Sequence, residues 1–121
     1  MATSISLAQS ATVRVSKNST VFQADGSKSD ATYGTVTSRI QIVGTSAELV
    51  NLGDLVGVPT LLILKHADTS NFVEVALDAG MTKKIAKIIV GRFAVLAPTT
   101  GTFYIRANTA PVNVLVFAVG A

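Results

Sequence analysis

The sequence VNVLVFAV at residues 112–119 carries the clearest β-strand signal in the chain. Side chains of a strand point alternately to its two faces, so residues two positions apart share a face. One face then carries Val112, Val114, Val116 and Ala118, and the other carries Leu115, Phe117 and Val119. This alternation predicts a strand over these residues.

Further short β-prone runs precede this strand. Residues 93–97 and 103–107 are followed by the turn sequences PTTG and NTAP, and residues 83–90 favour a strand over a helix because they are rich in β-branched isoleucine. The continuous apolar run LLIL at residues 61–64 is typical of a strand buried on both faces. A turn at residues 67–70 predicts that this run forms a central hairpin with residues 72–77.

Residues 39–43 (RIQIV) alternate between polar and apolar side chains, as in a half-buried strand. Residues 45–52 (TSAELVNL) fit either a strand or one helical turn, which Thr45 and Glu48 would open as a capping box. The chain therefore holds seven to nine short strands at a spacing of about ten residues. This spacing predicts an all-β protein with an antiparallel β-sandwich or jelly-roll fold.

The N-terminal residues also have strand character, at residues 5–7 and 12–15. Residues 23–34 (QADGSKSDATYG) are polar and predict an exposed loop, with its tight turn at Asp25-Gly26. We therefore expect residues 1–15 to form a strand or an extended arm and residues 16–121 to form a single sandwich domain. An arm of this kind adds to the sheet edge of a neighbour, which makes Ile5, Leu7, Val13 and Val15 candidate partner-interface residues.

The composition is poor in charge for a small soluble protein. Only 14% of the 121 residues are charged and 49% are hydrophobic, whereas soluble domains have about 25% charged residues. A folded chain of this size exposes about 6,000 Å², and soluble monomers rarely leave large apolar patches in water. The sequence therefore predicts a homo-oligomer, either a dimer or a trimer, or a subunit held in a larger assembly.

The net charge of +3 comes from the second half of the chain, where no acid follows Asp78. Lys83, Lys84, Lys87 and Arg92 are candidate contacts for an acidic partner, or else they mark a solvated sheet edge. The basic residues are too dispersed for a typical nucleic-acid interface, so direct nucleic-acid binding is not expected. The sequence has no signal-peptide pattern and no apolar run of membrane-spanning length, so no membrane association is expected either.

Motifs of catalysis are missing from the sequence. The single histidine, His66, ends an apolar strand and has no Gly-x-Ser-x-Gly elbow to support a catalytic role, so we expect it to donate a structural hydrogen bond. Asp68, Ser70 and Asn71 offer oxygen atoms to a calcium ion but are more typical of a turn. The glycines form no phosphate-binding loop and no cysteine is present. We therefore expect a protein that is not an enzyme and that has no cofactor or metal.

Tyr33, within the polar residues 23–34, is the one aromatic side chain that suits an exposed ligand loop for a glycan.

Four stretches of the sequence follow one another in a familiar order: IQIVGTSAELVNLGDL, LLILKHADTSNFVEVAL, IIVGRFAVLAP and FYIRANTAPVNVLVFAV. Together they resemble small β-sandwich virion proteins of tailed bacteriophages. The residues that carry the resemblance are Asp68, the Asn71-Phe72-Val73-Glu74 strand start, Gly91-Arg92-Phe93, and the stretch from Tyr104 to Val112. Arg92 stands where the family commonly has an acid, and His66 where it commonly has Asn.

This resemblance covers about two-thirds of the chain and implies a structural role on a virus particle. The expected role is capsid decoration (cement), with the major capsid protein or other virion proteins as partners. The alternative is a tail, neck or fibre component with a glycan- or receptor-binding role. Either role implies that the protein resides in the virion, which assembles in the host cytoplasm.

Overall fold

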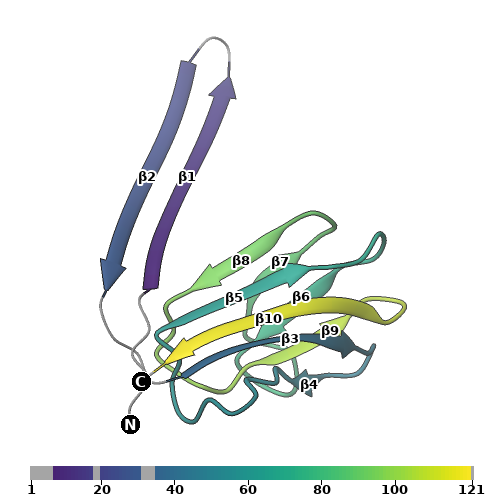
Figure 1. Ribbon diagram of the computed structural model, residues 1–121. Coiled ribbons are helices and arrows are strands. Elements are labelled where there is room, and N and C mark those ends of the chain that lie inside the picture. The colour runs from purple at the N-terminus through teal and green to yellow at the C-terminus, as the bar shows by residue number, and fades with distance from the viewer. Residues whose placement is uncertain (1–6, 18–19, 31–34, 121) are drawn as a thin grey trace, which may run out of the picture. The chain divides into compact units, whose positions relative to one another are not determined.

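The computed structural model describes residues 7–17, 20–30 and 35–120 (Figure 1). These residues form ten β-strands and no helix, so none of them lies in a helix that could span a membrane. Contacts divide the chain into two compact units, Met1–Gly34 and Thr35–Ala121. The expectation of an all-β, antiparallel protein is confirmed, because every strand pairing is antiparallel.

The first unit contains one hairpin of two long strands, β1 (Leu7–Lys17) and β2 (Thr20–Asp30). They pair along their whole length, from Leu7 opposite Asp30 to Lys17 opposite Thr20, and form a two-stranded sheet of their own. The strand expected at residues 12–15 is therefore confirmed as part of β1.

The loop expected at residues 23–34 was wrong for residues 23–30, which belong to β2. Asp25 and Gly26 do not turn the chain but pair with Thr12 and Ala11 of β1. The β-propensity of Gly, Asp and Ser is low, but strand formation depends on pairing partners more than on intrinsic preference. The long partner strand β1 supplies such partners. The compact units divide between Gly34 and Thr35, whereas the sequence suggested a boundary after residue 15.

The second unit consists of two four-stranded sheets. The first, which we call the β10 sheet, has the order β3 (Thr35–Val43), β10 (Val112–Gly120), β5 (Leu61–His66), β8 (Phe93–Leu96). The second, the β9 sheet, has the order β4 (Glu48–Leu49), β9 (Tyr104–Ala107), β6 (Val73–Ala76), β7 (Lys84–Ile88).

The pairing of these eight strands is that of a jelly roll. The chain folds back on itself so that β3 pairs with β10, β4 with β9, β5 with β8 and β6 with β7. Rolling this double strand adds the pairs β10–β5 and β6–β9, which close the two sheets. Two packed sheets built in this way define the double-sheet jelly roll.

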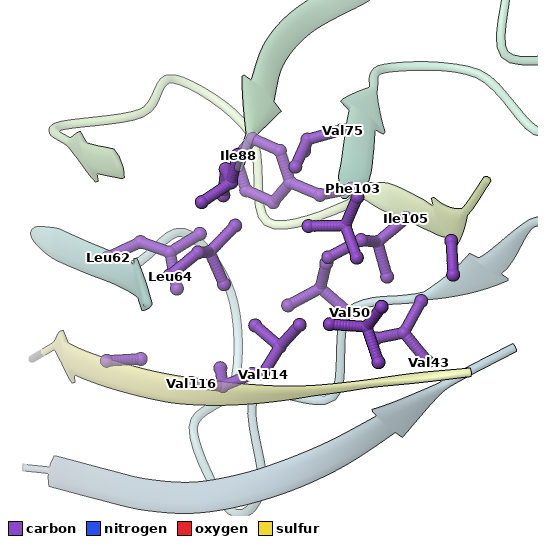
Figure 2. Close-up of a cluster of buried hydrophobic side chains, with 14 of the residues drawn as sticks. Val43, Val50, Leu62, Leu64, Val75, Ile88, Phe103, Ile105, Val114 and Val116 are labelled. Carbon is purple, nitrogen blue, oxygen red and sulfur yellow. The ribbon is translucent and has the colours of Figure 1, made fainter. Parts of the chain in front are cut away.

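The core lies between the two sheets. Figure 2 shows side chains of both layers pointing toward one another: Leu62, Leu64, Val114 and Val116 from the β10 sheet meet Val75, Ile88 and Ile105 from the β9 sheet. The face of the strand at 112–119 that carries Val112, Val114, Val116 and Ala118 is completely buried, as its alternation predicts. Phe103, which is 2% exposed, is among the largest buried side chains.

Two ambiguous segments are settled as strands: residues 45–52 contain β4, and residues 83–90 contain β7. The expected central hairpin of residues 61–64 and 72–77 was wrong. β5 pairs with β10 and β8, whereas β6 pairs with β7 and β9 in the other sheet. The short turn between them crosses from one layer to the other, because the two runs bury their apolar side chains against each other rather than side by side.

Candidate interaction surface

Strand β3 is turned so that its apolar residues face away from the core. Ile40 and Ile42 are 57% and 69% exposed, and Val36 is 45% exposed. The pairing places Gln41 beside Val114, which is buried in the core, so Gln41 lies on the inner side of the sandwich. A shift of one residue in register would bury the isoleucines instead. The register of β3 therefore determines that this row of apolar side chains faces solvent.

Polar contacts on the inner side of β3 hold this register. The amide nitrogen of Gln41 donates to the Glu48 carboxylate and to the Leu49 carbonyl, at 2.9 Å each, and its amide oxygen accepts from the Asn51 N–H at 2.8 Å. The Thr37 hydroxyl donates to the Leu52 carbonyl at 2.9 Å. Strand β4 and the residues that follow it thus cover the inner side of β3 with hydrogen-bonding groups that only polar side chains can satisfy.

The other strands of the β10 sheet extend the apolar surface of β3. We call its solvent side the outer face. Strand pairing aligns Ile40, Leu115, Lys65 and Phe93 in one row and Ser38, Phe117, Ile63 and Val95 in the next. Phe93 is 63% exposed and Val95 is 40% exposed. At about 200 Å² per large side chain, the five exposed apolar residues present roughly 500 Å². That area is at the upper end for a soluble monomer, whose largest patch is about 300–600 Å².

The β9 sheet presents a different solvent side, which is charged and internally paired. The Glu74 carboxylate lies 2.9 Å from the Lys84 ammonium and 3.6 Å from the Arg106 guanidinium. The Lys87 ammonium lies 4.2 Å from the centre of the Phe72 ring, a cation–π contact. The two sides of one sandwich are thus adapted to different surroundings, and the outer face of the β10 sheet is the candidate interaction surface.

The ion pairs of Glu74 make stability depend on pH. Lys84, by its hydrogen bond and its charge, lowers the pKa of the Glu74 carboxyl below the ordinary 4.5, and Arg106 adds to this effect. A lowered folded-state pKa stabilises the fold above the unfolded pKa, and this stabilisation is lost as the pH falls through the folded value. We therefore expect the free energy of unfolding to decrease below about pH 4.5. The free energy of unfolding of the Glu74→Gln variant should decrease less over this pH range than that of the wild type. The difference between the two decreases should be at most about 1 kcal/mol.

Urea denaturation at a series of pH values measures this difference. Asp68 and Asp78 also have lowered pKa values, through hydrogen bonds from Thr69 and Asn113 to Asp68 and from Thr82 and Lys83 to Asp78. The variant should therefore keep part of its acid sensitivity. Identical acid profiles for the two proteins would contradict a role of the Glu74 pairs.

The basic residues predicted as partner contacts are all exposed: Lys83, Lys84, Lys87 and Arg92. Lys84 and Lys87 lie on β7, which is an edge strand of the β9 sheet, as the solvated-edge alternative expects. Their contacts with Glu74 and Phe72 occupy two of these charges within the sheet. A role for the four residues in binding a partner stays a prediction.

Most of the apolar contact residues predicted near the N-terminus lie in the first hairpin. Leu7, Val13 and Val15 belong to β1, whereas Ile5 and the candidate glycan-binding residue Tyr33 lie outside the described residues. Sequence analysis did not predict the outer face of the β10 sheet, although the sequence pattern of β3 was recognised. The alternation in RIQIV predicts a strand with two different faces, but it does not predict which face packs against the core.

His66 is buried, as a strand-end residue with a structural hydrogen bond is expected to be. Its Nε2 lies 3.0 Å from the Asn71 carbonyl oxygen, and its Nδ1 accepts from the Asp68 N–H at 3.2 Å. These partners suit the neutral ring with its proton on Nε2. Both ring nitrogens are engaged by the backbone, so neither is placed to take a proton from a substrate.

Asp68 and Asn71 tie two turns of the sandwich together. The Asp68 carboxylate accepts from the Thr69 and Asn113 N–H groups, at 2.9 and 3.2 Å. Asn71 has a left-handed backbone with φ of 67°, and its side-chain oxygen accepts from the Thr109 hydroxyl at 2.8 Å. These contacts give Asp68 and Asn71 the turn-forming role that the sequence favoured over calcium binding.

Hollows of about 440 and 260 Å³ open among the described residues. The larger lies beside residues 49–55, and the smaller lies beside Leu77, Ile85 and Phe103; neither is lined by an ionisable side chain. No group of three or more His, Asp or Glu residues that would hold a metal ion occurs in the described part of the chain.

The fold and the surface together define a jelly-roll sandwich with one charged side and one apolar side. Comparison with known proteins found no matching family model, no matching curated protein and no matching solved structure.

Proposed function

We propose that this chain is a non-enzymatic structural subunit of a virus particle. In the form we favour, it is a decoration (cement) protein of a tailed-bacteriophage capsid, which stabilises the particle through subunit–subunit contacts. The proposal is supported most by the outer face of the β10 sheet, where five large apolar side chains are exposed beside a single charge, Lys65. A surface of this size and composition is typical of one that another subunit covers.

The energetics suit a subunit that binds repeatedly over a lattice. Covering roughly 500 Å² of apolar surface contributes about 12 kcal/mol at 25 cal/mol per Å². Lost translational and rotational freedom offsets about 4–15 kcal/mol of this gain, so a single contact is weak to moderate. When several such contacts form at once on a repeating particle, the overall affinity is much higher than that of a single contact. Jelly rolls also occur in viral capsid and lectin domains, which agrees with the proposal.

The test uses particles produced from the genome that encodes this chain, with its gene inactivated. Purified protein is added back, the particles are sedimented, and their temperature of disruption is measured. We expect the protein to sediment with the particles in a fixed ratio and to raise the disruption temperature. The proposal fails if the protein stays in the supernatant, or if particles with and without the gene are equally stable.

A further inference from the structure

We propose that the outer face of the β10 sheet is covered by the same face of a second copy of this chain, in a symmetric face-to-face dimer. This inference rests on the proposed structural role and names the partner of the same surface. The face offers no acidic group and only one basic group, Lys65, among its large apolar side chains. Its complement must therefore be flat, apolar and nearly uncharged, and the face itself has these properties.

The geometry of β-sheets favours such a contact. Two sheets stack face to face at about 10 Å, with their strands aligned to within about 30°. The rows Ile40–Leu115 and Phe117–Ile63 would then interdigitate with their copies. Lys65 is the last outward residue of β5 before the strand ends at His66. Its long stem can therefore carry the ammonium group to the rim, so the dimer does not bury a charge.

The area is sufficient for a stable dimer. Two copies bury roughly 1,000 Å² from the five exposed apolar side chains alone, at about 200 Å² per side chain. The half-buried and polar positions of the face bring the total into the range of about 1,200–2,000 Å² that specific interfaces bury. A four-stranded face is about 19 Å wide and a two-stranded hairpin about 10 Å. A second copy of the face thus matches its width.

The first experiment compares two substitutions at side chains of nearly equal exposure on opposite sheets. Ile40 is 57% exposed on the outer face, and Leu49 is 55% exposed on the β9 sheet. The full-length wild-type chain, Ile40→Asp and Leu49→Asp are purified without any other virion protein and studied by sedimentation velocity over a wide concentration range. We expect a wild-type dimer, a dissociation constant raised at least about 100-fold by Ile40→Asp, and a dimer that Leu49→Asp leaves intact. Each substitution occurs twice in a symmetric dimer, which enlarges its effect.

A wild-type chain that stays monomeric throughout, or two variants that dissociate equally, would overturn the inference. If a monomeric wild-type protein still sediments with particles that lack it, the proposed function stands and only the identity of the partner is wrong. If the protein is a dimer but does not sediment with those particles, the dimer inference stands and the proposed function is wrong. The two proposals therefore fail separately.

The second experiment identifies what covers the face, and it is simple because the natural chain has no cysteine. The variants Ile40→Cys and Leu49→Cys are labelled with a maleimide at increasing protein concentration. If a second copy covers the face, the rate of labelling at position 40 should fall at least about tenfold as the dimer forms. The rate at position 49 should not change. Protection at position 40 that does not depend on concentration would instead show that the chain covers its own face, and this result would overturn the inference.

Discussion

Val43→Asp is expected to unfold residues 35–120, whereas Ile42→Asp, one residue earlier, is expected to leave them folded. Val43 is 0% exposed and lies in the core, while Ile42 is 69% exposed on the outer face. An unpaired carboxylate buried among apolar side chains costs more than about 4 kcal/mol, a large part of the 5–15 kcal/mol that stabilises a typical domain. An exposed carboxylate costs less than about 1 kcal/mol.

Urea denaturation of the two variants, followed by circular dichroism, measures this contrast. The two positions differ in orientation but are adjacent in the same strand and have similar apolar side chains. Equal losses of stability would mean that Ile42 is part of the folding core and that the outer face is not free for a partner. A stable Val43→Asp variant would contradict the register of β3.

The strand content of the second unit could be predicted from sequence because short alternating runs are separated there by Gly, Pro, Asp and Asn. The run at residues 112–119 is the best example, since its inward positions are completely buried. The pairing of strands could not be predicted as well. Residues 61–66 and 73–76 are neighbours in sequence and looked like a hairpin, but in a jelly roll such neighbours lie in opposite sheets.

The outer face was beyond sequence analysis for a physical reason. The alternation of Arg39, Ile40 and Gln41 specifies two faces but not which one is inside. The assignment depends on Glu48, Leu49 and Asn51, whose backbone and side-chain groups bond Gln41 on the inner side. The low charge content predicts that other subunits cover part of the surface, and the outer face is the part for which we propose such a cover.

A second misreading, at Asp25-Gly26, had the opposite cause. This dipeptide is a strong turn signal on its own, yet it lies within β2, opposite Thr12 and Ala11. At Asp25-Gly26, pairing with a long partner strand overrode the local turn signal. In β3, the local alternation predicted the strand correctly but did not predict which face is buried. Both failures occur where contacts distant in sequence decide the outcome.

His66→Leu is expected to destabilise the jelly roll by about 2–5 kcal/mol, although leucine suits a buried strand position. The substitution removes the acceptor of the Asp68 N–H and the donor to the Asn71 carbonyl. A buried backbone group left without a partner costs about 1–3 kcal/mol, and two half-buried groups are affected here, so their combined cost stays below twice the upper value. Asn71 already has a left-handed backbone, so the turn has no easy way to relax toward water.

Thr69→Ala is the matched control, because Thr69 is exposed in the same turn and substitutions at exposed positions stay within about 0.5 kcal/mol. Chemical denaturation of the three proteins gives the comparison. A His66→Leu variant as stable as the wild type would mean that the two hydrogen bonds contribute nothing and that the histidine is present for another reason. A large loss confined to this variant would assign the single histidine of the chain to holding the turn between the two sheets.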